Sequence, residues 1–199
     1  MSELKLWNKY SFSGISVLDR GIKDFVNLNP VIIPKSNGRF QKKRFWKSKS
    51  NIVERLINKM QCPGHKGKKH FWTSRQCAGK YYTSSIIVEK AFGVIEKKTG
   101  RNPLEIFVRA VENSAPKEEV TTIEYGGTKA PKAVDVSPQR RVDLVLRWFI
   151  QGTYQEVVNK KKTMYNTLAG MIMQAAEKDP QCYPIKKKNE LERQAASSR

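Results

Sequence analysis

Apolar residues recur with helical spacing through most of the chain after residue 51, and with a period of two in one short stretch. Because a 3.6-residue period lines one face of a helix and alternation lines one face of a strand, the pattern predicts a mainly α protein with one small β element. The two strands are expected at Glu119–Tyr125 and Thr128–Val136, with Gly126-Gly127 as the hairpin turn. Pro131 confines the second arm to a sheet edge. Such a hairpin is unstable alone, so we expect it to project from the body and to be braced.

Six segments carry the helical pattern, and several carry start or stop signals. Asn51 can cap the first segment, and Asn102-Pro103 is a strong start signal for the third. Gly100 is a stop signal for the second, and Ser137-Pro138 starts the fourth. The predicted helices are 51–60, 84–98, 103 to about 116, 138 to about 156, about 161–178 and about 187–197. The expected fold is therefore a six-helix domain with the projecting hairpin between the third and fourth helices.

Residues 1–50 lack sustained periodicity, and prolines and glycines interrupt them. We expect an N-terminal extension that packs on the body or on a partner and is ordered mainly in an assembly. A short strand at 14–18 and a short helix at 18–27 are its candidate regular elements. The chain would then divide into this extension and a helical domain over 51–199, which carries the hairpin at about 119–136.

The charge of the chain restricts its function more than its fold. Lys and Arg number 38 against 18 Asp and Glu, for a net charge of +20. Such a chain repels itself unless a polyanion neutralises it, and the usual polyanions are nucleic acid and anionic membrane. The sequence has no apolar run of about 18 residues and no lipidation signal, so a membrane is not expected. The N-terminus does not resemble a secretory signal, so we do not expect secretion.

The basic residues gather in groups instead of spreading evenly. The largest group falls between residues 39 and 49 and is interleaved with aromatic residues. Its cations are Arg39, Lys42, Lys43, Arg44, Lys47 and Lys49, and its aromatic residues are Phe40, Phe45 and Trp46. The other groups are Lys66/Lys68/Lys69, Arg140/Arg141, Lys160–Lys162 and Lys186–Lys188. One group alone would be read as a solvated face, but five favour a phosphate-binding surface. The aromatic rings either stack on bases or anchor the extension on the body.

A candidate metal site lies in the loop after the first predicted helix. Cys62, His65, His70 and Cys77 follow the spacing Cys-x2-His-x4-His-x6-Cys. Zinc prefers four such ligands in a tetrahedron, so these residues are a candidate zinc site. The alternative is a basic, RNA-contacting loop with incidental Cys and His. Without a secretory signal, the three cysteines are better read as thiols or metal ligands than as disulfides.

Five stretches, taken together, carry a resemblance to a known family. They are Gly-Arg-Phe-Gln-Lys-Lys-Arg-Phe (38–45), Ile-Val-Glu-Arg-Leu-Ile-Asn-Lys-Met (52–60), Lys-Thr-Gly-Arg-Asn-Pro-Leu-Glu (98–105), Val-Asp-Val-Ser-Pro-Gln-Arg-Arg-Val (134–142) and Ile-Lys-Lys-Lys-Asn-Glu-Leu-Glu-Arg (185–193). The chain resembles the universal small-subunit ribosomal protein family called S-seven in bacteria and S-five in older eukaryotic naming. Its N-terminal extension and its Ser-Ser-Arg ending resemble the archaeal and eukaryotic branch. The Cys/His loop departs from the family pattern.

The resemblance implies a structural constituent of a cytoplasmic ribosome, assembled in the nucleolus if the source is eukaryotic. It implies binding to the three-prime major domain of small-subunit rRNA, a part in assembling the head, and a position beside the exit-site tRNA and the mRNA path. The implied partners are this rRNA and neighbouring ribosomal proteins of the head and platform, with no membrane and no small-molecule substrate.

By matching position, the resemblance implies RNA contacts before the first helix, on the hairpin, and at the starts of the fourth and sixth helices. The expected RNA-binding residues are Arg39, Lys42, Lys43, Arg44, Lys47, Lys129, Lys132, Arg140, Arg141, Lys186, Lys187 and Lys188. For Arg140 and Arg141 the alternative is ordinary helix surface, with Asp135 as the expected salt-bridge partner at the hairpin base.

Two other classes of protein remain as alternatives. An enzyme acting on RNA would need a nucleophile–base pair, a carboxylate pair or a phosphate loop, and none of the corresponding motifs occurs, so catalysis is not expected. A nucleic-acid module outside the ribosome, such as an assembly factor or a DNA-binding protein, would also be basic and helical. A DNA reader needs a polar recognition helix, and the fourth predicted helix is too apolar for that role.

Overall fold

The computed structural model describes residues 4–64, 74 and 77–199, and this part of the chain contains six α-helices and one β-hairpin. The helices are α1 (Ile52–Met60), α2 (Tyr81–Thr99), α3 (Pro103–Ser114), α4 (Pro138–Val157), α5 (Met164–Ala176) and α6 (Tyr183–Ser197). The strands β1 (Glu118–Tyr125) and β2 (Thr128–Asp135) lie between α3 and α4. The predicted fold class, mainly α with a hairpin between the third and fourth helices, is confirmed.

The starts of α1 and α3 follow the capping chemistry that the sequence predicts. The Asn51 side chain accepts a hydrogen bond from the Val53 amide at 2.9 Å, and Asn102 accepts one from Leu104 at 3.1 Å. These bonds satisfy amides that have no partner within the helix. Gly100 ends α2 in the left-handed conformation, with φ of 64°.

Two helices begin earlier than predicted. α2 begins at Tyr81 instead of 84, because a tertiary contact holds the extra turn: the Tyr81 hydroxyl donates to the carbonyl of Pro34. α6 begins at Tyr183 instead of 187, because Pro184 lies in its first turn, where a missing N–H costs no helical hydrogen bond. Both deviations come from residues outside the apolar stripe on which the prediction rested.

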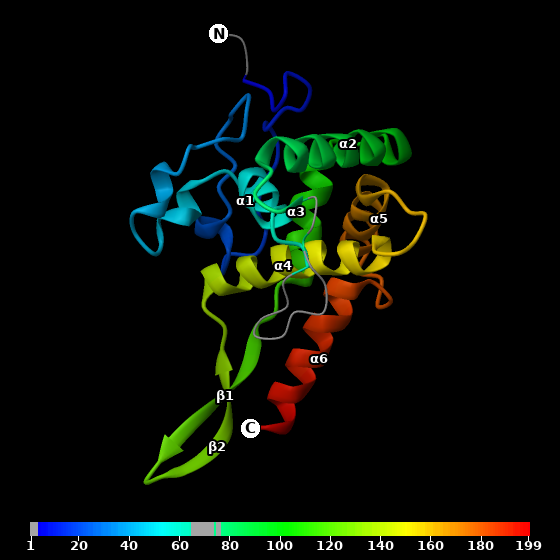
Figure 1. Cartoon of the computed structure of the whole chain (residues 1–199). Helices are drawn as coiled ribbons and strands as arrows, with labels where there is room; N and C mark the ends of the chain where they lie inside the picture. The colour runs from blue at the N-terminus through cyan, green and yellow to red at the C-terminus, as the bar shows by residue number, and fades with distance from the viewer. Residues whose placement is uncertain (1–3, 65–73, 75–76) are drawn as a thin grey trace.

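A single large hydrophobic core joins α1 to α5. Its centre is a row of buried phenylalanines, with Phe92 to Phe107 at 5.8 Å and Phe107 to Phe149 at 6.4 Å between ring centroids. α5 packs against α2, α3 and α4, as Figure 1 shows on the side of the molecule away from the N-terminal extension.

The N-terminal extension contributes to this same core. Its buried side chains are Leu6, Tyr10, Phe12, Val17, Ile22 and Val26. The rings of Trp7 and Tyr10 meet Phe92 edge-on, at 5.8 and 6.2 Å. Of the two expected regular elements, the strand at 14–18 is absent among the described residues, and the helix at 18–27 is reduced to a 3₁₀ turn, η1 (Lys23–Phe25). The amides of Leu18 and Asp19 instead donate to the Glu112 carboxylate, which replaces backbone pairing.

The hairpin projects from the helical body and is braced from one side (Figure 1). Tyr125 pairs with Thr128, so Gly126 and Gly127, both with positive φ, form the two-residue loop that suits the strand twist. At the base, Val136 packs with Leu144 and Trp148 of α4, and Leu191 of α6 covers them.

Polar contacts add to this brace. The Glu192 carboxylate of α6 accepts from the Lys117 amide at 3.0 Å, and Arg199 pairs with Glu118. The expectation that something braces the hairpin is therefore confirmed, and α6 supplies much of the brace. Among the described residues, no helix is long and apolar enough to cross a bilayer.

Replacing Asn102 by Ala should lower the free energy of unfolding by about 1–2 kcal/mol. The substitution removes the cap of α3 and also the hydrogen bond that the Asn102 amide donates to the Ser11 carbonyl at 2.7 Å. Urea unfolding followed by circular dichroism measures the loss. Ser137→Ala is the matched control, because Ser137 occupies the same position before α4 without a side-chain cap bond. Equal losses in the two variants would contradict this account of the cap.

Candidate nucleic-acid interface

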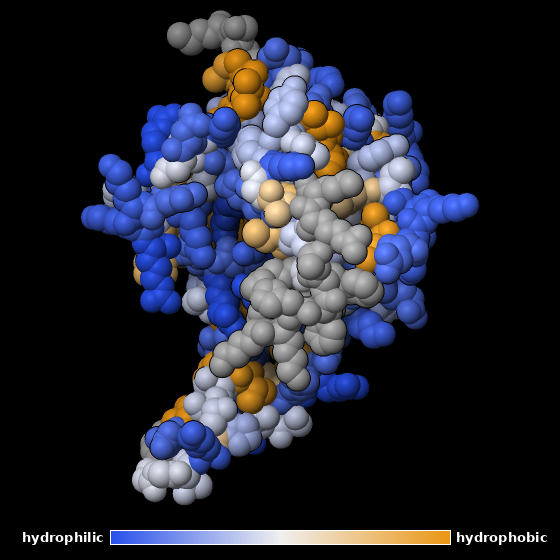
Figure 2. Space-filling model, in the orientation of Figure 1, coloured by the Kyte–Doolittle hydropathy of each residue, from blue (hydrophilic) through white to orange (hydrophobic). Residues whose placement is uncertain are grey.

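The basic–aromatic segment, residues 35–49, forms a cation-rich surface beside α1. Arg39, Lys42, Lys43 and Arg44 are all exposed. It contains two 3₁₀ turns, η2 (Arg39–Gln41) and η3 (Trp46–Lys49), which fold it compactly without a long helix. Figure 2 shows strongly hydrophilic residues over the side of the molecule where Figure 1 places this segment.

Cations and aromatic rings alternate in contact along this segment. The ammonium groups of Lys43 and Lys49 lie 5.3 and 4.8 Å from the Trp46 ring centroid. The Arg44 guanidinium lies 5.7 Å from the ring of Phe45, which is 64% exposed. Such contacts hold cations beside flat apolar faces, the combination that binds phosphates and unstacked bases together.

Side chains of α1 and its cap hold the extension in place. The Glu54 carboxylate accepts from the Ser36 amide at 2.9 Å and from its hydroxyl, and the Asn51 amide donates to the Asn29 carbonyl at 3.0 Å. Asn27 in turn donates to the Lys49 carbonyl. These bonds fix the start of the basic–aromatic segment on α1 and its end on Asn27 of the extension.

A buried guanidinium adds a second attachment. Arg55, on α1, donates to the Phe25 carbonyl at 2.8 Å and to the Asp143 carboxylate of α4 at 3.0 Å. Lys47 pairs with the same carboxylate. Burial alone would raise the pKa of Asp143, but the hydrogen bond from Lys47 and the charge of Arg55 outweigh it and lower that pKa. Lys47, expected at RNA, is thus also engaged inside the chain.

The two arginines at the start of α4 have intramolecular partners. Arg141 is only 7% exposed; it pairs with Asp19 at 2.7 Å and donates to the Pro116 carbonyl at 3.0 Å. Arg140 holds Glu119 of β1 through two nitrogens, at 2.7 and 2.8 Å. The acidic partners are therefore Asp19 and Glu119, not the expected Asp135. An RNA contact by either arginine stays a prediction.

The remaining predicted cations lie at three separate places. Lys129 and Lys132 are exposed on β2 of the hairpin. In the first turns of α6, Lys186 is exposed, Lys187 pairs with Glu190 at 2.6 Å, and Lys188 donates to the Asn113 carbonyl at 2.8 Å. Burial lowers the pKa of Lys188.

Two cations that sequence reasoning missed lie beside the basic–aromatic segment. Lys59 follows Arg55 by four residues on α1, and Arg147 follows Asp143 by four on α4. This spacing places each of them one turn along the same helix face. Burial, and then the charge of Arg147, lowers the pKa of Lys59, so the two cations are close. Helical spacing from Arg55 and Asp143 was the signal that could have found them.

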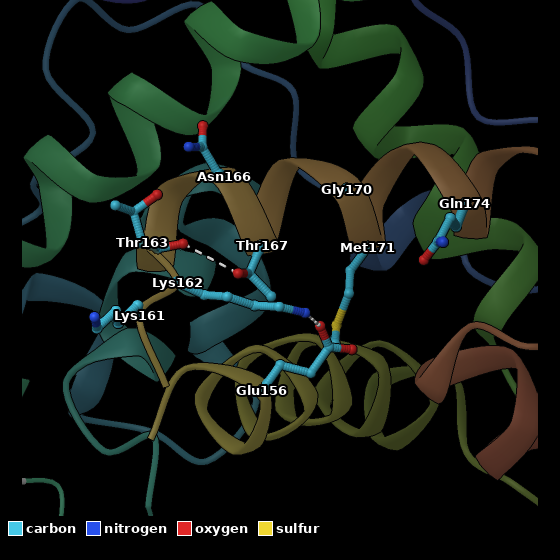
Figure 3. A pocket seen from close by; sticks show the side chains of 9 residues that line it. All are labelled: Glu156, Lys161, Lys162, Thr163, Asn166, Thr167, Gly170, Met171 and Gln174. Carbon is cyan, nitrogen blue, oxygen red and sulfur yellow. Dashed lines mark hydrogen bonds and ion pairs between the residues drawn. The ribbon is translucent and has the colours of Figure 1, made fainter. Parts of the chain in front are cut away.

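Lys160–Lys162 precede α5 in a loop, where the prediction had begun the helix at 161. An open depression of 480 Å³ lies between this loop, the end of α4 and one face of α5 as far as Gln174 (Figure 3). Lys162 reaches across it to Glu156 at 3.5 Å, and the Thr167 hydroxyl donates to the Thr163 carbonyl at 3.0 Å. Phosphate binding by Lys160–Lys162 stays a prediction.

The candidate zinc ligands are only partly covered by the structure. Cys62 is exposed and Cys77 is buried, while His65 and His70 lie outside the described residues. Burial raises the pKa of the Cys77 thiol. Within 4–64, 74 and 77–199, no group of three or more His, Cys, Asp or Glu is arranged to hold a metal. Zinc binding by these four residues stays a prediction from their spacing.

Comparison with known proteins gives one consistent family. A family model described as ribosomal protein S7p/S5e matches residues 23–199. The small ribosomal subunit protein uS7 of Nanoarchaeum equitans is 46% identical over 197 residues, which cover 99% of this chain and 100% of that protein. The protein of the same name from Cenarchaeum symbiosum is 46% identical over 196 residues, which cover 98% of this chain and 97% of that protein.

Replacing Asp143 by Asn should lower the free energy of unfolding by roughly 3 kcal/mol at neutral pH, because it leaves the Arg55 guanidinium buried without its counter-charge. The folded-state pKa of Asp143 is lowered, so its contribution is present above the unfolded pKa of about 4 and is lost as the pH falls through the folded value. The difference between wild type and variant should therefore shrink in acid. Urea unfolding from about pH 7 to pH 2 tests this. Asp135→Asn, at an exposed position, is the control. A difference in unfolding free energy between wild type and Asp143→Asn that does not change with pH would contradict this account.

Proposed function

Because the chain belongs to the ribosomal protein S7p/S5e family, we propose that it is a structural constituent of the small ribosomal subunit and acts by binding the rRNA of that subunit. Members of this family are not enzymes, and the full-length similarity to two archaeal proteins named uS7 supports the structural role. A ribosome in the cytoplasm is the corresponding location; assembly in a nucleolus would apply only to a eukaryotic source.

The observation that carries this proposal is the exposed cation surface of the basic–aromatic segment. Four of its cations, Arg39, Lys42, Lys43 and Arg44, have no acidic partner in the described part of the chain, and the segment is fixed on a rigid body. Cations presented in this way bind phosphates and release counterions from RNA. A rigid surface also recognises the shape of folded RNA without the entropy cost of ordering a loose arm.

We propose further that the bound RNA is the three-prime major domain, and that the protein helps to organise the head of the subunit. Neighbouring ribosomal proteins of the head and platform would be its protein partners. The hairpin would reach the exit-site tRNA and the mRNA path, because it projects from the body and presents Lys129 and Lys132 to solvent. Lys186, Lys187 and Lys188 would contact rRNA from the start of α6.

Replacing Lys42, Lys43 and Arg44 together by Gln should weaken binding to a transcript of the three-prime major domain. Each lost phosphate contact should reduce the slope of log affinity against log salt by roughly 0.7–0.9. Filter binding at several salt concentrations measures both quantities. The matched control is the triple Gln replacement of Lys97, Lys98 and Arg101, which are exposed around the end of α2. The same loss of affinity in both triple variants would mean that net charge, and not this surface, binds the RNA.

The tagged protein should sediment with small subunits in a sucrose gradient of a native lysate and should remain there at high salt. Salt weakens phosphate contacts but not contacts that recognise the shape of folded RNA, and a core ribosomal component makes many of the latter, so high salt should not release it. Identification of the RNA in the protein's fractions completes the measurement. Sedimentation as free protein, or only with precursor particles, would instead favour an assembly factor or another nucleic-acid binder.

A further inference from the structure

A small polar groove lies between the basic–aromatic segment and helices α1 and α4. We call it the α1–α4 groove; its volume is 210 Å³. The residues that matter for its chemistry are Phe40, Gln41, Arg55, Asn58, Lys59 and Asp143. It is smaller than the roughly 300–1,000 Å³ of pockets that bury drug-sized ligands, so it suits a single flat group.

Three cations and two carboxylates line the groove: Lys47, Arg55 and Lys59 against Glu54 and Asp143. Asp143 is shared by Lys47 and Arg55, and in the described ranges no carboxylate pairs with Lys59 or Arg147. Lys59 is half-buried with Arg147 close by, so its positive charge is unfavourable in the free protein. An anion beside these two side chains would relieve that cost.

A buried donor in the wall of the groove also lacks an acceptor. Arg55 is 6% exposed; its two terminal nitrogens are bonded, but its Nε is buried without a hydrogen-bond partner. A buried donor without an acceptor costs free energy unless a bound ligand supplies that acceptor. The groove therefore combines cation excess with unsatisfied hydrogen-bonding capacity.

The rest of the lining suits a nucleobase better than a simple anion. Phe40 offers an aromatic ring, and Leu146 adds apolar surface. The amides of Gln41 and Asn58 can each donate and accept, which matches the mixed edge of a base. Phe40 also lines an adjoining depression of 240 Å³, so it stands between two hollows.

We propose that the α1–α4 groove takes one unpaired nucleotide of the bound RNA. Its base lies against Phe40, its edge meets the Gln41 and Asn58 amides, and its phosphate faces Lys59 and Arg147. This assignment rests on the proposed RNA-binding function and adds to it a specific subsite: the protein requires an unstacked nucleotide at one point of its RNA, besides phosphates along its surface.

The test uses the full chain bound to a transcript of the three-prime major domain of an archaeal small-subunit rRNA, with base-specific chemical probing at single-nucleotide resolution. In Phe40→Leu, protection of one unpaired nucleotide should be lost while the other protections remain, and affinity should fall about five- to tenfold. Tyr82→Leu is the matched control, because it removes a ring that is 79% exposed at the start of α2, outside the groove and outside the basic–aromatic segment. Lys59→Gln should also expose that nucleotide, and Lys59→Arg should keep it protected.

The outcomes separate this proposal from the proposed function. Full protection in Phe40→Leu, with an affinity equal to that of Tyr82→Leu, overturns the groove assignment and leaves RNA binding intact. Failure of the wild-type protein to bind the transcript overturns the function itself. Protection of that nucleotide that appears only after other ribosomal proteins are added would mean that those proteins, and not the groove, shield it, and would overturn the assignment.

Circular dichroism and urea unfolding establish that each variant is folded. A second measurement does not depend on variants: ultraviolet cross-linking of the wild-type complex followed by mass spectrometry should recover a nucleotide attached to the peptide that contains Phe40. A cross-link only to other peptides would count against the groove.

Discussion

The arrangement of the basic–aromatic segment depends on one buried guanidinium. Arg55 cannot shed its charge, so it needs acceptors inside the protein, and it finds them on the extension at Phe25 and on α4 at Asp143. One side chain of α1 thus joins three parts of the molecule that are far apart in the sequence. The hydrophobic contacts of the extension bury apolar surface, but they do not specify a single orientation. The directional hydrogen bonds of the charged network fix where the basic–aromatic segment lies.

The fold followed from the sequence where local chemistry decides structure. Asn51, Asn102 and Gly100 mark helix ends because each meets a need of the adjacent backbone, and Gly126-Gly127 specifies a hairpin loop in the same local way. The sequence left open whether the extension packs on the body or on a partner, because its apolar residues have no regular spacing. Its anchoring to Phe92 and Glu112 is visible only once the tertiary structure brings those residues together.

The candidate site was predictable in composition and less so in detail. The cation groups stand out in the sequence, but the acidic partner of each cation does not. The burial of Arg141 against Asp19 could therefore not be predicted, and neither could the pairing of both Lys47 and Arg55 with Asp143. Lys59 and Arg147 were missed because neither belongs to a run of cations, and each lies on a helix that also forms the core. A search for runs of charge finds flexible, exposed segments first, whereas grooves are lined by isolated polar residues on different elements.

The brace of the hairpin has a consequence for the order in which the molecule is built. β1 and β2 bury little apolar surface of their own, and the residues that steady them, Leu191, Glu192 and Arg199, follow only after α4 and α5. During synthesis the hairpin therefore leaves the exit tunnel of the ribosome well before α6 does. Until α6 docks, the two strands are only marginally stable as a pair, and the orientation of the hairpin on the helical body is not fixed. The part of the molecule that reaches farthest outward is thus fixed late, after most of the helical core has already been made.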